Sequence, residues 1–411
     1  MKRMKKMVMD WDLMRAGDPG AADSRKLIFA ADWAPIRRFE PVMADDPVGC
    51  YGDVLPLLQS ADLRIVNFEC TLQGDGQPVR KGGPNLSAAE KHLECLKAGG
   101  FEIATLANNH IFDYGPAGFQ ATVRALDRLS IRYFGAGMNL SEAQKPLTIE
   151  LDGLRIGFCG FTEGHDLSGA GENTPGVAPW RPEQVCRQVA ELRKTCDLVF
   201  VIPHGGIEFS AWPAPYCIDA YRQIADARPD AIIAHHPHVP QGMEFYGGVP
   251  IFYSLGNFLF YQETRLIHRK HGFLVELSVG KDGLRGFQLH PYGIDDCGVH
   301  LLKGDEKTAF ARLFKDLSRP FAGDPYEGYY GTLKERWHSG YAAGEFRKAV
   351  SFFDTDPMKA AALFRNRMTT LQHTELWIPM FDRVARGTID DAPEWSTAME
   401  HEFMSTEIGG A

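Results

Sequence analysis

Short runs of apolar residues recur along the chain, and most of them stop at a polar side chain. Six runs have the length and the β-branched or apolar content of strands: Lys26–Ala31, Leu63–Phe68, Glu102–Ala107, Leu198–Pro203, Ala231–Ala234 and Pro250–Leu255. Helical patterns lie between them, at Ser87 to about Gly99, Pro116 to about Leu129, Pro182 to about Leu192, and Tyr216 to about Ala227. This alternation predicts an α/β layered architecture.

Other strand-like runs follow one another without a helix between them. They are Pro146–Glu150, Leu154–Cys159, Gly272–Val279 and Leu284–Pro291. The turns at Asp152-Gly153 and at residues 281–283 predict hairpins, so we expect mixed strand directions and two sheets.

Past Leu301 the pattern becomes helical, with expected helices at Lys307–Leu317, Pro357–Gln372 and Leu376–Arg386. We therefore expect three parts: an N-terminal tail or extra helix at 1–25, a main unit at 26–299, and a helical C-terminal region at 300–411.

Composition and charge narrow the class of protein. The 411 residues are 44% hydrophobic and 24% charged, with a formal net charge of −9, which is typical of a globular protein and disfavours nucleic acid or anionic membrane as a partner. The basic N-terminal stretch is interrupted by Asp10 and Asp12, so no signal peptide or membrane span is predicted. The eight cysteines form no C-x-x-C pair, which favours reduced, buried thiols and a cytoplasmic location. The oligomeric state is not predicted.

Ligand-type side chains stand where the apolar runs end. Loops at the carboxyl ends of strands are where open α/β folds bind their ligands. Five strand ends carry such groups: Asp32, Glu69, Asn109 with His110, His204, and His236 with His238. This mixture suits Mn, Fe or Zn. Without His110, six groups remain, more than the three protein ligands of one catalytic zinc, so we expect two divalent ions with one carboxylate bridging them.

Each of these residues alone would be weak evidence. A strand-end histidine is more often a packing or hydrogen-bonding residue, and an aspartate there often caps a turn. His-x-His chelates well if the segment is extended, because alternate side chains then point the same way. The coincidence of five strand ends is what predicts a metal site.

The same residues lie in motifs that resemble a known family, the CapA-type capsule (poly-γ-glutamate) synthesis proteins, itself similar to the calcineurin-like metallophosphoesterases. The similarity spans about Lys26 to Pro291. The motifs occur in this order: Asn67-Phe68-Glu69, Asn108-Asn109-His110-Ile111-Phe112-Asp113-Tyr114-Gly115, His204-Gly205-Gly206-Ile207-Glu208-Phe209, His235-His236-Pro237-His238-Val239 and Tyr253-Ser254-Leu255-Gly256-Asn257-Phe258.

The resemblance implies a fold, a four-layer αββα sandwich of the metallophosphoesterase type. It also implies roles: Asp32 as the aspartate that opens the site, Glu69 in place of the bridging aspartate, Asn109, His204, His236 and His238 as further metal ligands, and His110 as the proton donor to the leaving group. Asp113 would orient His110 or cap the next helix.

The chain departs from the pattern of the family at three positions, one of which is Ala31 in place of the glycine usual before the first aspartate. Asp32-Trp33-Ala34 lacks the histidine of the usual Asp-x-His motif, which leaves one or two metals open, with His235 as a substitute ligand or a packing residue. Gly205 stands where many relatives have tryptophan.

The expected activity is metal-dependent hydrolysis of a phosphoester in a small or polymeric anionic substrate. Hydrolysis or transfer at an amide or γ-glutamyl bond is the alternative, and a non-catalytic role in capsule or polyglutamate biosynthesis is the other. The basic, glycine-bearing loop 80–85 could hold an anion or be a solvated loop. The candidate substrate contacts are Lys81, Asn85, Glu208, His235 and Asn257.

Overall fold

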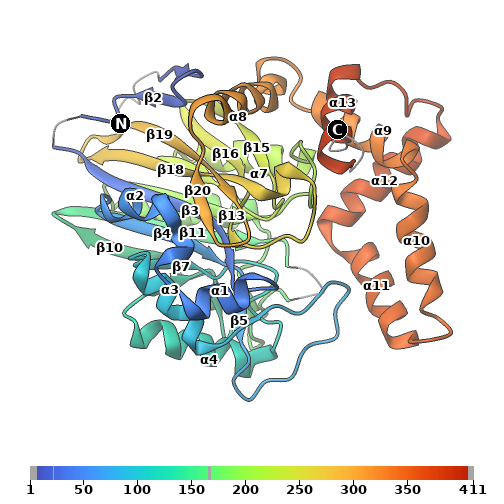
Figure 1. Cartoon of the computed structure of the whole chain (residues 1–411), viewed down its shortest axis with the longest axis horizontal. Helices are drawn as coiled ribbons and strands as arrows, with labels where there is room; N and C mark the ends of the chain where they lie inside the picture. Colours follow the sequence, from blue (N-terminus) through green and yellow to red (C-terminus); the bar gives the residue numbers. More distant parts are fainter. Residues whose placement is uncertain (1–6, 22, 165–167, 406–411) are drawn as a thin grey trace.

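Two β-sheets packed face to face form the centre of the protein (Figure 1). The computed structural model describes residues 7–21, 23–164 and 168–405. The first sheet has the order β1-β2-β19-β18-β3-β4-β7-β8, with β17 on β3 and β20 on β19. Its strands are β1 Met9–Asp10, β2 Arg15–Gly17, β3 Arg25–Ala34, β4 Leu63–Phe68, β7 Ile103–Thr105, β8 Arg132–Phe134, β17 Asn257–Phe260, β18 His271–Gly280, β19 Gly283–Ile294 and β20 Val299–Leu301.

The second sheet has the order β10-β11-β13-β14-β16-β15. Its strands are β10 Leu147–Leu151, β11 Leu154–Thr162, β13 Leu198–His204, β14 Ala231–Ile233, β15 Pro240–Tyr246 and β16 Val249–Leu255. In each sheet the middle strands are parallel: β3, β4, β7 and β8 in the first, and β11, β13, β14 and β16 in the second. Their carboxyl ends therefore gather at one edge of each sheet. Two short pairs, β5 Thr71–Leu72 with β6 Ser87–Ala88 and β9 Ala136–Gly137 with β12 Gly176–Val177, lie apart from both sheets.

The sequence of β13 is apolar throughout because both faces of the strand are buried. Phe200 and Ile202 face the first sheet, whereas Val199 and Val201 face the helices on the other side. A strand buried on both faces has no polar face, so its residues form a continuous apolar run.

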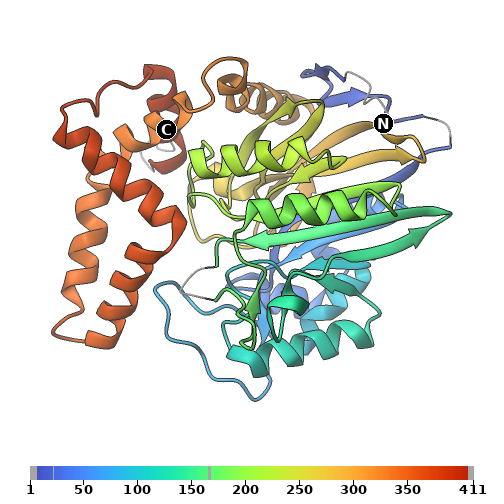
Figure 2. The ribbon, with the colours of Figure 1, turned by 180° about the vertical axis from the view of Figure 1, so that it is seen from behind.

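Helices cover the outer faces of both sheets. α6 Pro182–Leu192 and α7 Pro215–Asp226 lie over the second sheet (Figure 2), where Val185, Val189 and Leu192 are buried. The helices beside the first sheet are α1 Phe39–Asp45, α2 Leu55–Gln59, α3 Leu93–Ala98 and α4 Gly115–Arg128, and a short α5 Leu140–Ala143 follows β9. The predicted four-layer αββα architecture, with a helical C-terminal region, is confirmed.

Two predicted elements differ in detail. Ser87 does not start a helix. It lies in β6, its hydroxyl accepts from Gln73, and helical structure begins at Glu90. The N-terminal segment, expected as a tail or a helix, forms β1 and β2, and β2 pairs with β19. Met14, in the turn between β1 and β2, is buried. Residues 1–6 and 22 lie outside the described residues.

The C-terminal region stands beside the sandwich as a group of helices (Figure 1). They are α8 Gly304–Leu317, α9 Glu327–His338, α10 Tyr341–Ser351, α11 Pro357–Thr369, α12 Leu371–Ala385 and α13 Glu394–Met404. Phe310 and Phe314 of α8 pack on Phe273 of β18, so the sandwich core extends past residue 300. The division of the chain into parts at residue 299 stays a prediction. Among the described residues, no helix combines the length and apolar character needed to cross a membrane.

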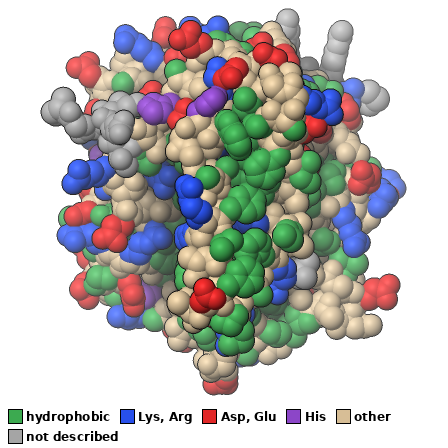
Figure 3. Space-filling view, turned by 90° about the vertical axis from the view of Figure 1, so that its right-hand side faces the viewer, with side chains coloured by type: hydrophobic (Ala, Val, Ile, Leu, Met, Phe, Trp, Pro, Cys, Tyr) green, Lys and Arg blue, Asp and Glu red, His purple; other side chains and the backbone are tan. Residues whose placement is uncertain are grey.

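The outer side of the C-terminal helices is apolar (Figure 3). The exposed large hydrophobic side chains on α10 to α12 and on the turn between α10 and α11 are Val350, Phe353, Met358, Met368, Ile378 and Phe381. Exposed apolar side chains that gather in this way are unusual for a protein surface.

Packing between the sheets should dominate stability. The ring of Phe200 lies 5.4 Å from that of Phe29 in the opposite sheet and 5.8 Å from that of Phe158, measured between ring centroids. We expect Phe200→Ala to lower the free energy of unfolding by about 3–5 kcal/mol, because it leaves a cavity between the sheets. Chemical denaturation measures this. The control Phe353→Ala, at a side chain that is 53% exposed, should change the free energy by less than about 0.5 kcal/mol; equal effects would contradict the prediction.

Candidate metal centre

The predicted ligand residues come together at the carboxyl ends of the parallel strands. Asp32 lies near the end of β3, Glu69 follows β4, and Asn109 and His110 follow β7 in the first sheet. His204 ends β13, and His236 and His238 follow β14 in the second sheet. All seven side chains are at most 7% exposed. The two sheets thus contribute opposite walls of one buried site.

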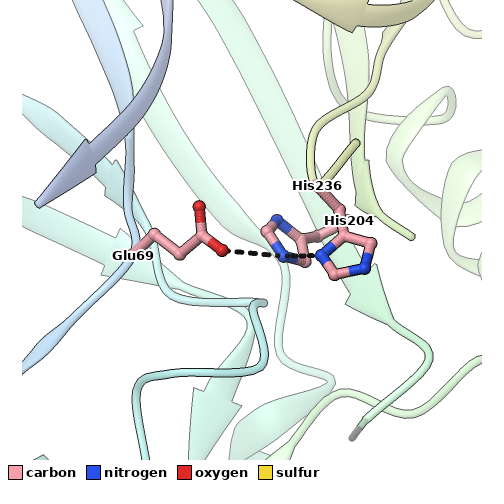
Figure 4. A group of neighbouring side chains, drawn as sticks. All are labelled: Glu69, His204 and His236. Carbon is pink, nitrogen blue, oxygen red and sulfur yellow. Dashed lines mark hydrogen bonds and ion pairs between the residues drawn. The ribbon is translucent and has the colours of Figure 1, made fainter. Parts of the chain in front are cut away.

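Two groups of candidate ligands share Glu69. In the first, Glu69 meets His204 and His236 (Figure 4), and in the second it meets Asp32 and His238; within each group the ligand atoms lie within 4.8 Å of one another. Oε1 of Glu69 is 3.4 Å from Nε2 of His204 and 3.6 Å from Nε2 of His238. Glu69 therefore occupies the position between two potential cation sites.

The buried oxygens of these carboxylates fit a bound cation. Both carboxylate oxygens of Glu69 and Oδ2 of Asp32 are buried without a hydrogen-bond partner among the described residues. A buried charge left in this state is costly unless it is paired or coordinates a metal. Carboxylates together with imidazoles form a donor set suited to Mn, Fe or Zn.

The two carboxylates and two of the imidazoles have strongly shifted pKa values. Burial, with the charges of Asp32 and Glu208 nearby, raises the pKa of Glu69 well above its usual value. Burial opposes ionisation of Asp32 too, but contacts with His235 and His238 hold its pKa well below the usual range. Burial also lowers the pKa of His204, and that of His236 to about 4. At neutral pH both imidazoles are neutral, the form that binds a metal.

Neighbouring amides hold the ligands in place. Oδ1 of Asn109 lies 2.9 Å from Nε2 of His204. The amide of Asn67 donates to Oδ1 of Asp32 at 2.8 Å and lies 3.2 Å from Nδ1 of His204. Oδ1 of Asn257 lies 2.9 Å from Nδ1 of His238, and its amide donates to the His238 backbone carbonyl; its contact with substrate stays a prediction. These are the contacts of a residue that orients His238.

The histidine loop is not the extended segment that the sequence suggested. His236 and His238 have φ angles of 104° and 58°, in a region that non-glycine residues rarely adopt. Such strain persists where the surroundings fix it, and it is common at functional sites. The tight loop, rather than strand alternation, brings both rings to Glu69.

His235 lies against the far side of Asp32. Its Nδ1 is 3.3 Å from Oδ1 of Asp32, the oxygen that also accepts from Asn67, whereas His238 lies 3.2 Å from Oδ2. His235 is thus adjacent to the site but in neither ligand group.

His110 and Asp113 form a buried pair beside the ligands. Nδ1 of His110 is 2.7 Å from Oδ2 of Asp113, whose other oxygen accepts from Nζ of Lys81 at 2.5 Å. Although burial opposes ionisation, His110 and Lys81 lower the pKa of Asp113. The ionised Asp113 therefore holds the His110 hydrogen on Nδ1, and Nε2 is the ring nitrogen that does not contact Asp113.

The loop with Lys81 and Asn85 is built around Asp113. Lys81 is buried and also donates to the Asn109 carbonyl at 3.0 Å. Asn85 donates to the carbonyls of Val79 and Asp113. Both side chains are engaged with the protein, so their contacts support the His110–Asp113 pair.

Glu208 marks the more open side of the site. Its side chain is 36% exposed and lies 4.0 Å from Nε2 of His236. The C-terminal helices hold its backbone: its N–H donates to Oε1 of Gln372 in α12 at 3.3 Å, and its carbonyl accepts from Arg336 in α9 at 2.9 Å. Arg336 is buried in an ion pair with Glu400 of α13 at 3.2 Å. No residue spacing in the sequence predicts these contacts.

A further carboxylate was missed by the sequence reasoning. Glu163 follows β11 and accepts hydrogen bonds from the Gly206 and Gln372 N–H groups and from the Tyr216 hydroxyl, at 3.0, 2.7 and 2.9 Å. The strand-end rule applied to β11 would have found it. Nearby, a Cβ at Gly205 would lie 2.6 Å from the Trp180 ring, so an indole already fills the space beside that glycine.

Known proteins resemble this chain in sequence and in chain trace. Residues 26–262 match the sequence model of a family described as bacterial capsule synthesis protein PGA_cap. The PGA biosynthesis protein CapA of Bacillus subtilis (strain 168) is 34% identical over 64% of this chain and 70% of its own length. The capsule biosynthesis protein CapA of Bacillus anthracis is 31% identical over 65% and 67%. A solved structure of a Mycoplasma pneumoniae phosphatase, 14% identical, covers 71% of this chain and 99% of its own with a TM-score of 0.43.

The ionisation of Glu163 should make stability depend on pH. Burial raises its pKa from 4.5 to about 7, against the hydrogen bonds that it accepts. The folded protein thus holds this proton more tightly than the unfolded chain, so its contribution is largest below about pH 4.5 and is lost as pH rises through 7. We expect Glu163→Gln to remove this decline, as measured by denaturation between pH 5 and 8. Glu191→Gln, at an exposed residue, should follow the wild type; parallel curves for all three proteins would contradict the prediction.

Proposed function

Since the chain belongs to the bacterial capsule synthesis protein (PGA_cap) family, we propose that it is a hydrolase that uses divalent metal ions to cleave a phosphoester. The metals would be two ions of Mn, Fe or Zn, held by Asp32, Glu69, Asn109, His204, His236 and His238. The observation that carries the proposal is the sharing of Glu69 between two groups of ligands, with its oxygens buried and unsatisfied. His238 and Asp32 would hold one ion, and His204 and His236 the other, so the missing Asp-x-His histidine would weaken only the first.

Bound metal supplies an acidified water and a positive charge that stabilises the transition state. The chain's own groups would complete the reaction. A water oxygen attacks phosphorus, the bond to the leaving oxygen breaks, and that oxygen takes a proton from Nε2 of His110. Asp113 accepts from Nδ1 of His110 and, against the burial that lowers the His110 pKa, would stabilise the imidazolium formed when Nε2 takes up a proton from solvent before transfer; Lys81 keeps Asp113 ionised. The proton lost from the attacking water leaves to solvent.

Cleavage or transfer at an amide or γ-glutamyl bond is the second candidate. The Bacillus subtilis relative is a PGA biosynthesis protein, which favours a polyglutamate or peptide-like substrate for this chain. The same residues could serve, because the amine that leaves also needs a proton. In a non-catalytic biosynthesis factor, the metal site would bind a ligand without catalysing its conversion. A cytoplasmic location stays a prediction.

Metal content tests the shared role of Glu69. After reconstitution with Mn²⁺, we expect Glu69→Gln to weaken the binding of both ions by at least about tenfold, because it removes a ligand from both groups. We expect His238→Ala to remove one equivalent and to spare the other. Equilibrium dialysis followed by elemental analysis measures both.

The matched control is Glu276→Gln, a buried carboxylate that pairs with His290 and Lys26 outside the site. It should bind metal as the wild type does. Wild-type stoichiometry and affinity in Glu69→Gln would refute the proposed ligand set.

Turnover tests the proton donor. We expect His110→Ala to lower kcat on an aryl phosphate by about 10²–10⁴-fold with metal content unchanged, because the leaving oxygen loses its proton donor. A leaving group of low pKa should reduce this effect, since it departs without a proton.

His268→Ala is the control for turnover, since His268 is also a buried histidine paired with a carboxylate, Glu402, at 2.9 Å. It should keep wild-type kcat. A wild-type protein with stoichiometric metal that cleaves neither phosphoesters nor γ-glutamyl bonds would refute hydrolysis and favour the non-catalytic role.

A further inference from the structure

Arg269 is a half-buried arginine whose guanidinium forms no ion pair in the part of the chain that the structure describes. It lies in the short 3₁₀ turn Ile267–Lys270 between β17 and β18, outside the segment that matches the family. Its Cζ lies 3.7 Å from the centre of the Phe209 ring, and its Nε is buried without a hydrogen bond. Two other arginines differ, since Arg336 pairs with Glu400 and Arg367 pairs with Glu345.

Two contacts tie Arg269 to the metal centre. Its backbone carbonyl accepts from the Asn257 amide at 3.1 Å, and the Asn257 oxygen lies 2.9 Å from Nδ1 of His238. The ring of Phe209, on which the guanidinium stacks, has its centre 5.9 Å from that of the His238 ring. Phe209 is fixed in turn, because its N–H donates to the Pro237 carbonyl at 2.8 Å. Arg269 is therefore held against the residues that surround His238.

The stacked geometry favours an anion as the missing partner. Stacking on Phe209 uses the flat face of the guanidinium, whereas its N–H groups lie in the plane and remain available to an acceptor. Burial and the neighbouring Arg336 lower the pKa of Arg269 to about 10, so the group is charged at neutral pH. The charge of Glu208 favours the cation, but the buried Nε lacks a hydrogen bond from the described residues, and a planar carboxylate or phosphate edge would satisfy the guanidinium with two parallel hydrogen bonds.

We infer that Arg269 binds a second anionic group of the substrate, a phosphate or a carboxylate, beside the group that reacts at the metal centre. The inference rests on the proposed function and narrows it to substrates with at least two anionic groups. Glu208 directly precedes Phe209 in the sequence, and its carboxylate lies 4.0 Å from Nε2 of His236. It would repel an anion placed nearer to His236. Arg269 would thus set the direction in which a substrate extends away from the ligands.

Binding measured without turnover tests the inference. Titration calorimetry of the metal-reconstituted protein would use three probes: inorganic phosphate, pyrophosphate and γ-glutamylglutamate. We expect Arg269→Ala to weaken pyrophosphate or the dipeptide by about 10-fold to 100-fold, with phosphate changed less than about threefold. The probe that responds identifies the anion as phosphate or carboxylate. Arg269→Lys should restore part of the affinity, because it keeps the charge and loses the planar fork.

Arg383→Ala is the matched control. Arg383 also stacks on an aromatic ring, 4.7 Å from the centre of Tyr330, and its Nε is also buried without a hydrogen bond, but it lies on α12 and contacts the Asp391 carbonyl. It should bind every probe as the wild type does. Wild-type affinity for all probes in Arg269→Ala, or no probe binding to the wild type, would overturn the inference. Arg269-dependent binding with no hydrolysis of any substrate would overturn the proposed function alone.

Discussion

The carboxylate of Glu69 lies wholly inside the protein, and neither of its oxygens receives a hydrogen bond from a described residue. His204 and His236 do not supply the missing positive charge, because burial lowers their pKa values and leaves them neutral. A carboxylate in this position needs a cation or a proton. The rest of the site follows from that need, since two sheets direct their strand ends at this one side chain.

The sequence was most informative where the geometry is local or repeats. Buried parallel strands have continuous apolar runs, and the residue after such a run must lie at the carboxyl edge of its sheet. This rule placed Asp32, Glu69 and His204 near one another before any coordinates, and the structure brings them together. The histidine loop was predicted for the wrong reason, because its pairing arises from left-handed backbone at His236 and His238 and not from strand alternation.

What the sequence could not reveal depends on contacts between distant segments. Arg336 and Gln372 hold the two backbone groups of Glu208 from helices more than a hundred residues away, and a buried Arg336–Glu400 pair has no spacing that marks it. The sequence left open whether the loop of Lys81 and Asn85 holds an anion or is solvated, and it gave no sign that both side chains contact Asp113. No sequence pattern distinguishes Arg269 from the other arginines, because its stacking on Phe209 depends on the fold.

Because Glu208 is held by α9 and α12, its position can change in evolution independently of the strand ends that carry the candidate ligands. The candidate ligands lie at strand ends whose backbone is fixed by the sheets, so substitutions there would alter the candidate metal centre itself. Glu208, which is 36% exposed beside His236, takes its position from helices that lie beyond the segment shared with the family. Insertions or substitutions in those helices can shift Glu208 while the candidate ligands stay in place. A lineage could therefore change the surroundings of the candidate metal centre by remodelling a peripheral support, with the centre itself inherited unchanged.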